Sequence, residues 1–422
     1  MKISKVKPDR IFSITFWSIV VFSIFAVIIF AFLPKSSSIW LDEAYSILIA
    51  DNNLLDILKK MKTDNSPPLY FFVFSIWIKI FGIGEYASQA FSGLMYALSV
   101  LSVYLFCKKL HKHKLAIFMC TFLFAMSPIT IFHSQNIRMY SMLGFFSVLS
   151  TWFFIAVFQN QNKRKLNILL YCLAAICGTF THMFFQFVVF SQIIAYFAAF
   201  FSKKTFKIFL VAMFISLIPF YFLWAPILLT NNIGASVSWI TKFPLMKSIS
   251  DVLLIQLINS KIILFLILIF SLLRIRKTNL DNKYNLKINL WNARFWRFFR
   301  TRTNTFLSVY FITVLLAPLI TSQFKPLYWP WRGMIIAAFP FSLLLGSFFV
   351  KFVNRFVVLA ISFLIMIVAI NNFYTIQKNW KKSNIAEKSA QYLIKNINAN
   401  DVVIFTSLSR ASVEYYTKLK AP

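Results

Sequence analysis

Long apolar segments alternate with short basic segments along most of the chain. The first apolar segment runs from Ile11 to Leu33 and contains no ionisable side chain. It is longer than the roughly 20 residues that a helix needs to cross a hydrocarbon core about 30 Å thick. It also exceeds the apolar core of a cleaved signal peptide, and no small-residue cleavage site follows it, so we predict a retained first membrane helix.

The distribution of lysine and arginine gives the predicted helices an orientation. Basic clusters occur before Ile11, around Lys108, around Lys163, around Lys203, from Arg274 to Arg302, and around Lys351. Loops on the cytoplasmic side of a membrane carry an excess of these residues. If every cluster is cytoplasmic, an even number of spans must separate successive clusters.

One apolar segment in the first interval breaks this parity. The stretch from Pro67 to Ile83 is short, opens with Pro67-Pro68 and carries Lys79, so we interpret it as a juxtamembrane helix at the outer face. Eleven transmembrane helices then remain. We predict them at Ile11–Leu33, Phe91–Phe106, Leu115–Phe132, Met139–Phe158, Leu166–Thr181, Met183–Phe201, Phe206–Leu229, Val252–Leu273, Thr305–Thr321, Met334–Val350 and Phe356–Phe373.

Composition agrees with a membrane protein. Hydrophobic residues make up 59% of the 422 positions and charged residues 13%, about half of the share in a typical soluble domain. The net charge of +32 is divided among short segments between apolar runs, which is typical of membrane orientation and not of nucleic-acid binding. The four cysteines lie in or beside apolar segments without metal-ligand spacing, so we interpret them as packing residues.

Two outer segments show structure of their own. In the first, Asn53 precedes a lysine-rich amphipathic stretch and has Asp56 three residues further on, which predicts a capped surface helix. The tail shows helical periodicity at Asn384–Ile397 and Ser409–Leu419, and a strand-like Asp401–Thr406 between them. A single strand makes no independent sheet, so the tail must dock on the membrane part or begin a longer domain.

The predicted fold is therefore an all-α polytopic membrane protein with outer juxtamembrane helices and a small α/β outer C-terminal segment. Its transmembrane domain covers residues 1–373, with the first outer loop at 34–84. The outer C-terminal segment covers residues 374–422, and we expect it to be part of an incomplete domain.

An acidic pair follows the first predicted span. Only 12 acidic residues occur in the chain, and Asp42 and Glu43 stand side by side in the sequence WLDEAYS. A carboxylate near hydrocarbon is costly and tends to be functional. A charge pair that favours a helix dipole explains the same feature equally well.

Other polar residues are predicted on the same outer face. Asp64 and the Pro67-Pro68-Leu69-Tyr70 sequence lie in the first outer loop, Gln135, Arg138 and Tyr140 follow the third span, His182 follows the fifth, and Arg332 opens the tenth. Each alone has an ordinary structural explanation, because interfacial arginine and tyrosine are common anchors. Together they predict a site for an anionic, lipid-linked substrate.

Several of these stretches resemble a known family. The stretches SPPLYFFVFSIWIKIFGIGE, SPITIFHSQNIRMYSML, THMFF, SWITKFP and WRGMIIAAFP are similar to the polyprenyl-phosphate-sugar-dependent glycosyltransferases of the C superfamily. These include bacterial relatives of the protein O-mannosyltransferases and the aminoarabinose and galacturonic acid transferases of lipopolysaccharide. The chain departs from the family at Ser66, where a histidine is frequent, at Gln89, where an arginine is frequent, and at Gly333, where a tyrosine often follows the arginine.

The resemblance implies a glycosyltransferase that uses a sugar on a polyprenyl phosphate. It places the catalytic base at Asp42 first and Glu43 second. We expect Arg138, Arg332 and His182 to bind the donor phosphate, and a divalent metal is left open because no close-spaced ligand motif is present. The remaining expected substrate contacts are Tyr45, Asp64, Pro67, Pro68, Tyr70, Gln135 and Tyr140.

The expected partners are the lipid-linked sugar, membrane lipids and an acceptor that is a glycan, a lipid or a protein. The expected location is a bacterial inner membrane, with the site facing the periplasm or exterior. A transporter or lipid flippase is the main rival to an enzyme, but transporters place charges near mid-membrane, whereas here polar residues collect on one face. A glycan ligase or polymerase of the same superfamily, or an inactive relative with a scaffold role, also fits these features.

Overall fold

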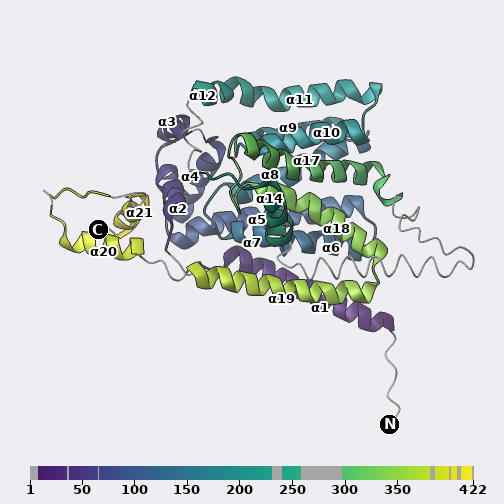
Figure 1. Ribbon diagram of the computed structural model, residues 1–422, viewed down its shortest axis with the longest axis horizontal. Coiled ribbons are helices and arrows are strands. Elements are labelled where there is room, and N and C mark those ends of the chain that lie inside the picture. Colours follow the sequence, from purple (N-terminus) through teal and green to yellow (C-terminus); the bar gives the residue numbers. More distant parts are fainter. Residues whose placement is uncertain are drawn as a thin grey trace, which may run out of the picture.

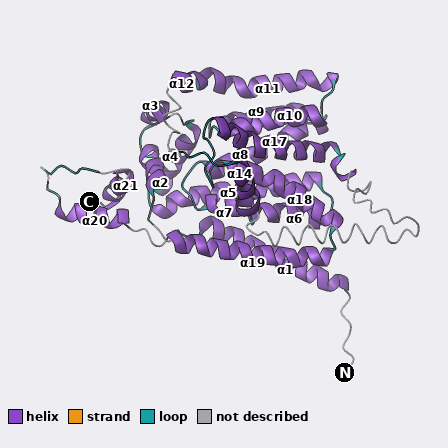
Figure 2. Ribbon diagram, viewed as in Figure 1, coloured by secondary structure: helices purple, strands orange, loops and turns teal. Residues whose placement is uncertain are grey.

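The computed structural model describes residues 8–35, 38–64, 66–230, 240–257, 297–380, 385–398, 401–405 and 410–420. Helices account for its regular structure, and no strand occurs in these ranges (Figures 1 and 2). Most of the long helices run side by side across the view in Figure 1, with the basic helix ends at the right and helices α2 to α4 at the left.

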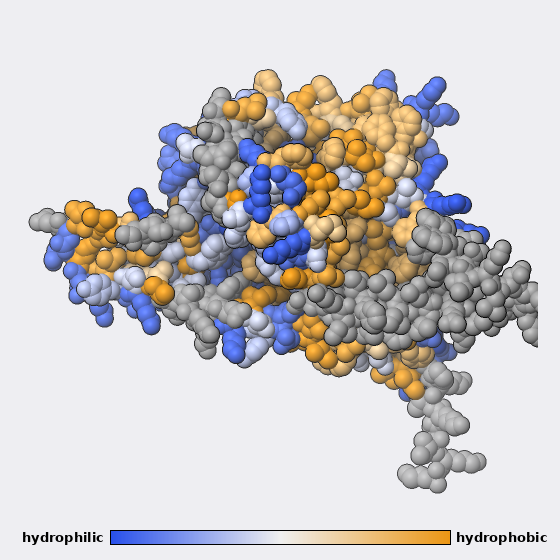
Figure 3. Space-filling model, viewed as in Figure 1, coloured by the Kyte–Doolittle hydropathy of each residue, from blue (hydrophilic) through white to orange (hydrophobic). Residues whose placement is uncertain are grey.

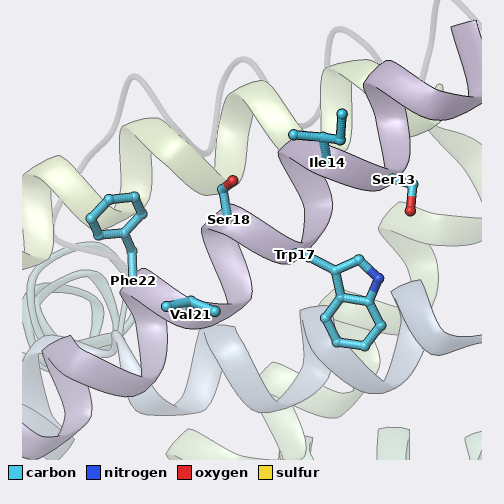
Figure 4. A pocket seen from close by; sticks show the side chains of 6 residues that line it. All are labelled: Ser13, Ile14, Trp17, Ser18, Val21 and Phe22. Atoms are coloured by element: carbon cyan, nitrogen blue, oxygen red, sulfur yellow. The ribbon is translucent and has the colours of Figure 1, made fainter.

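Among the described residues, seven helices are long and apolar enough to cross a membrane. They are α1 (Pro8–Phe32), α5 (Glu85–Leu110), α8 (Tyr140–Gln159), α11 (Lys203–Leu223), α17 (Arg302–Phe324), α18 (Ala338–Phe352) with the 3-10 turn η2 (Met334–Ala337) before it, and α19 (Arg355–Trp380). The chain is a multi-pass membrane protein. Side chains on the outward face of α1, among them Ile14, Trp17 and Phe22, are exposed and line a shallow depression (Figure 4). An apolar exposed face of this kind is suited to contact lipid.

An eighth candidate span is broken in the middle. Helices α6 (Lys114–Ala125) and α7 (Pro128–Ser134) together are long enough to cross the membrane but meet at a bend of 58°. Proline disfavours helical geometry at the residue before it, and Ser127 has an extended backbone at ψ 131°. The bend turns α7 toward the outer-face residues that follow it.

The predicted count of eleven spans is not confirmed. Helices α9 (Arg164–Thr179) and α10 (Phe185–Ala199) form where spans were predicted, but with 16 and 15 residues they are shorter than the other candidates. The predicted span at Val252–Leu273 lies almost entirely outside the described residues. Its first residues belong to a π-helix, η1 (Asp251–Leu257), which follows α14 (Leu245–Ser250).

The short helices of the first outer loop agree with the sequence prediction. The excluded segment forms α4 (Leu69–Phe81), whose 13 residues are too few to span a membrane. The side chain of Asn53 accepts a 2.9 Å hydrogen bond from the Asp56 N–H and caps α3 (Leu54–Asp64). Together with α2 (Leu41–Ala50), these helices form a compact group at one end of the bundle (Figure 1).

The tail docks on this group, which is one of the two arrangements expected from its sequence, but the predicted α/β segment is not confirmed. Helices α20 (Ile385–Asn396) and α21 (Arg410–Lys420) form where helical periodicity predicted them, whereas residues 401–405 form no strand. Because a strand needs a hydrogen-bonding partner strand, this segment alone could not become a sheet. The Tyr416 hydroxyl accepts a 2.6 Å hydrogen bond from the Ile39 N–H, and the Tyr415 hydroxyl donates to the carbonyl of Ile83 over 3.0 Å.

The basic segments gather at the other end of the bundle. Arg355 at the start of α19 pairs with Asp9 at the start of α1 over 2.6 Å, and Gln159 at the end of α8 bonds Thr303 near the start of α17. Figure 3 shows hydrophobic residues over much of the face that α10, α11 and α17 present, with hydrophilic residues along the right edge, where α10 ends and α11 and α17 begin. The two ends of the bundle therefore differ in chemistry: one carries cations, and the other carries the clustered carboxylates, histidines and tyrosines described next.

Candidate active site

Asp42 stands in the first turn of α2, where the free N–H groups of a helix favour a negative charge. Its carboxylate accepts a 2.8 Å hydrogen bond from the Arg332 guanidinium. About a quarter of each side chain is exposed, 24% for Asp42 and 28% for Arg332, so both groups can be reached by a ligand. The structure thus joins two predicted site residues that are 290 positions apart in the chain.

Arg138 approaches Asp42 from the loop between α7 and α8 (residues 135–139). One guanidinium nitrogen donates to the Asp42 carbonyl over 3.1 Å and to the Ser46 hydroxyl over 3.0 Å. Arg138 therefore fixes the first turn of α2 while placing a second cation beside the carboxylate. Two guanidinium groups near Asp42 give an anionic ligand two cations to contact, and Asp64 also interacts electrostatically with Arg138.

Glu43 has a different environment from its neighbour. It is fully buried, forms an ion pair with Lys35, and accepts a 3.1 Å hydrogen bond from the Ile137 N–H. The two carboxylate oxygens thus hold the segment before α2 and the loop between α7 and α8. In this arrangement Asp42 is the better placed of the two predicted bases.

His182 lies in the turn between α9 and α10, where Nδ1 accepts a 3.0 Å hydrogen bond from the Phe184 N–H. Burial, with the charges of Arg138 and Arg332, lowers the pKa of His182 to about 3. The imidazole is therefore neutral, and because Nδ1 accepts, its proton resides on Nε2. His182 can offer a neutral N–H donor beside the two arginines.

We expect this histidine to give the folded protein a specific pH dependence. An unfolded histidine takes up a proton near pH 6.5 whereas the folded one does not until about pH 3, so this contribution to stability is complete above pH 6.5 and falls as the pH drops toward 3. Thermal unfolding of the purified protein between pH 7 and 4 measures it. Between pH 7 and 4, the melting temperature of His182→Gln should fall less than that of the unsubstituted protein. An equal fall in the two proteins would contradict a neutral His182.

The predicted tyrosines lie near His182 and Asp64. Tyr140 packs its ring 5.3 Å from that of His182 and 4.6 Å from that of His133, between centroids. Tyr70 is fully buried at the start of α4, and Tyr45 shares a hydrogen bond with Asp64. Burial raises the pKa of Asp64, whose carboxylate also accepts from Ser66 over 2.7 Å.

Buried polar atoms near Arg138 have incomplete hydrogen bonding. The Tyr70 hydroxyl, the Asn136 side-chain oxygen and Nε of Arg138 have no partner within the described part of the chain. A buried polar atom left unpaired costs about 1 to 3 kcal/mol. Three such atoms in one neighbourhood fit a region that receives a polar ligand.

Two groups of predicted contacts serve the framework. Gln135 donates to the Phe30 carbonyl and accepts from Gln89 and Gln377 over 2.9 and 3.0 Å, so it ties α7 to α1, α5 and α19. Pro67 and Pro68 are buried, and the Leu69 N–H after them donates to the Phe180 carbonyl, which joins the start of α4 to the turn that carries His182. These residues position the site by holding its segments together.

The turn that carries Arg332 has an unusual backbone. Trp331 and Gly333 both have positive φ, 66° and 70°, and a Cβ at position 333 would lie 2.4 Å from the Phe184 ring. This explains why glycine follows the arginine here in place of the tyrosine frequent in the family. The strained turn aims Arg332 at Asp42 and packs against the turn that holds His182.

We expect Gly333→Ala to destabilise the protein by about 1 to 3 kcal/mol, because it adds both strain at positive φ and a clash with Phe184. The matched control is Gly84→Ala, since a Cβ there meets open space. Thermal unfolding of the two purified variants compares them. Equal melting temperatures would contradict the close packing of this turn.

Sequence reasoning missed Lys35 and His133. Lys35 follows the first span by two residues, and only the fold reveals that it neutralises Glu43. His133 is 1% exposed and packs against Tyr140, but its position in the sequence gives no sign of this contact. Among the described residues, no group of three or more histidines, cysteines and carboxylates is arranged to hold a metal.

Comparison with known proteins supports the fold. Residues 65–226 match the model of the dolichyl-phosphate-mannose-protein mannosyltransferase family. ArnT from Cupriavidus metallidurans in the apo state aligns with a TM-score of 0.65 at 11% identity, over 96% of this chain and 85% of that one. The same protein bound to undecaprenyl phosphate aligns with a TM-score of 0.56 at 10% identity, over 96% and 75% of the two chains.

A second solved protein is similar over a shorter part of its length. The apo oligosaccharyltransferase of Archaeoglobus fulgidus aligns with a TM-score of 0.54 at 14% identity, and the alignment covers 91% of this chain but 58% of the archaeal chain. No curated protein matches in sequence. The chain therefore shares the fold of these two solved proteins, and residues 65–226 are similar in sequence to the dolichyl-phosphate-mannose-protein mannosyltransferase family, in agreement with the resemblance seen in the sequence.

Proposed function

We propose that this protein is an inverting glycosyltransferase that moves a sugar from a polyprenyl phosphate to an acceptor hydroxyl. The observation that carries the proposal is the partly exposed Asp42 carboxylate, paired at 2.8 Å with Arg332 and flanked by Arg138. A carboxylate that accepts a proton and cations that receive a phosphate are the two parts this reaction needs. The fold of a protein solved with bound undecaprenyl phosphate supports the choice of donor.

In the proposed reaction, Asp42 removes the proton from the acceptor hydroxyl as its oxygen attacks the anomeric carbon. The new glycosidic bond forms while the bond between that carbon and the phosphate oxygen breaks, which inverts the configuration. The polyprenyl phosphate leaves with the electron pair and one more unit of negative charge. Arg332, Arg138 and the N–H of His182 stabilise that charge where it develops.

The ion pair between Asp42 and Arg332 has a role in this scheme. Without a donor, Arg332 satisfies the carboxylate; a bound phosphate attracts the same guanidinium, which can contact both anions because it carries five N–H donors. The general base is thus placed next to the phosphate before the acceptor arrives. Glu43 remains buried and maintains the position of α2.

The neighbouring residues fit recognition of the sugar and the acceptor. Tyr45, Asp64, Tyr70 and Tyr140 present hydroxyl and carboxylate oxygens around the charged group, suited to hydrogen bonds with sugar hydroxyls. We assign the site to the outer, periplasmic face of a bacterial inner membrane, because the basic helix ends lie at the opposite end of the bundle. The acceptor belongs to an envelope glycan, a lipid or a protein.

Purified protein incubated with labelled polyprenyl-phosphate sugars tests the proposal. We expect release of polyprenyl phosphate and transfer of label to an acceptor fraction from envelope material. A transporter moves the lipid across vesicles without cleaving it, so intact donor on the opposite leaflet would support a flippase instead. No cleavage of any donor in a panel of common sugars would contradict a transferase.

A further inference from the structure

A polar cavity lies at the opposite end of the bundle from Asp42. It has a volume of about 520 Å³ and forms where the end of α5, the start of α6, the start of α17 and the end of α18 meet. Its polar wall includes His111, His113, Thr301, Asn304, Ser347 and Lys351. Its apolar wall includes Leu307 and Val350, so the cavity offers both kinds of surface to one ligand.

The charge around this cavity is almost entirely positive. The Lys351 ammonium forms part of the wall and lies 5.1 Å from the Phe298 ring centroid. Two wall residues, His113 and Thr301, each have a basic residue on both sides in the sequence: Lys112, Lys114, Arg300 and Arg302. Among the described residues, the acidic group at this end is Asp9, which is paired with Arg355. A ligand of this cavity should therefore be an anion.

Two helices begin at the cavity and add to its positive potential. The start of α6 has His113 at its N-cap without a side-chain capping bond, and α17 begins after Thr301, which accepts from the Asn304 N–H over 3.3 Å. The first N–H groups of a helix carry partial positive charge and bind anions such as phosphate. Here the two helix starts and Lys351 line the same cavity, which gives an anion a defined location.

Aromatic residues and lysines occur together near the cavity. Near it, the Lys114 ammonium lies 5.7 Å from the Trp17 ring centroid, and the Lys108 ammonium lies 5.4 Å from that of Tyr104. Tryptophan and tyrosine with neighbouring lysines are typical of the boundary between hydrocarbon and water. We therefore expect a ligand of this cavity to come from the membrane interface.

We propose that this cavity binds the headgroup phosphate of an anionic membrane phospholipid. Lys351 and the helix starts at His113 and Thr301 bind the phosphate. His111 and Ser347, whose Nε2 and Oγ atoms lie 3.0 Å apart, close the inner polar wall. Leu307 and Val350 contact the first methylene groups of the acyl chains. The site is separate from the Asp42 site and does not depend on the proposed transferase activity. A lipid held there links α5, α6, α17 and α18 at their basic ends.

Lipid binding by the purified full-length protein tests this site. Native mass spectrometry counts retained lipids during titration with phosphatidylglycerol, and with zwitterionic phosphatidylcholine as the comparison. We expect tighter binding of phosphatidylglycerol, weakened about fivefold by Lys351→Gln, the effect of one lysine near an anionic surface. Lys165→Gln is the matched control, because Lys165 is exposed in the first turn of α9 and does not line the cavity.

A second variant separates the cavity from its charge. Val350→Trp fills the volume without changing the net charge and should weaken phosphatidylglycerol binding as well. The proposal is wrong if Lys165→Gln weakens binding as much as Lys351→Gln, since the effect would then be diffuse surface charge. Equal binding of the two lipids, or displacement of phosphatidylglycerol by millimolar inorganic phosphate, would also overturn it, the latter by assigning the site to a free anion.

Discussion

Asp42→Asn is expected to reduce sugar transfer by about 10² to 10⁴-fold, the contribution of a positioned general base. Asparagine has almost the same shape, and its side-chain oxygen can still accept the hydrogen bond from Arg332. The substitution therefore removes proton acceptance while keeping the 2.8 Å contact that positions the two groups. Transfer of labelled sugar under saturating donor measures the loss.

Two controls give this result its meaning. Donor affinity and melting temperature should change little in Asp42→Asn, because the cations and the packing of α2 remain. Asp56→Asn removes a carboxylate from the same outer loop and should leave transfer nearly unchanged, because Asp56 is partly exposed on α3 and pairs weakly with Lys59. Full activity of Asp42→Asn would remove Asp42 from the mechanism.

Glu43 provides a contrast that the sequence could not supply. Adjacent acidic residues on a helix point in different directions, since successive residues are separated by about 100° around its axis. Asp42 reaches the partly exposed side of α2, whereas Glu43 turns inward to Lys35 and Ile137. The pair in the sequence therefore becomes one candidate base and one structural ion pair.

Much of the local structure follows from short-range signals. The Asn53 cap, the short helix after Pro67-Pro68 and the two tail helices each depend on neighbouring residues, so the sequence alone predicts them well. Charge distribution also places the basic segments at one end, because membrane insertion imposes this bias on the whole chain. These features need no knowledge of tertiary contacts.

The rest depends on contacts between distant segments. The sequence suggested a substrate contact for Gln135, but in the fold its side chain bonds Gln89 and Gln377 from two other helices. The strand expected near Asp401 needs a partner strand, and none occurs among the described residues of the tail. The positive φ at Trp331 has no sequence signal, since tryptophan rarely adopts it, and it is maintained by the packing around Arg332.

We expect the second large effect, on donor binding and transfer, from substitution of Arg332. Arg332→Gln should weaken donor binding roughly 10- to 100-fold, the equivalent of losing a hydrogen bond between charged groups. Transfer should fall further than affinity, because the departing phosphate carries more charge in the transition state than in the bound donor. Lysine keeps one charge but cannot contact Asp42 and a phosphate with two parallel N–H groups, so Arg332→Lys should recover only part of the loss.

A matched control separates this role from general electrostatics. Lys325 is an exposed cation in the same segment between α17 and η2, so Lys325→Gln removes an equal charge without changing the Asp42 contact. Binding of a fluorescent polyprenyl phosphate at several salt concentrations should show a weak, salt-screened effect for Lys325→Gln and a large effect for Arg332→Gln that persists at high salt. If donor affinity is unchanged in Arg332→Gln, the guanidinium serves only to hold Asp42, and phosphate binding must then rest on Arg138 and His182.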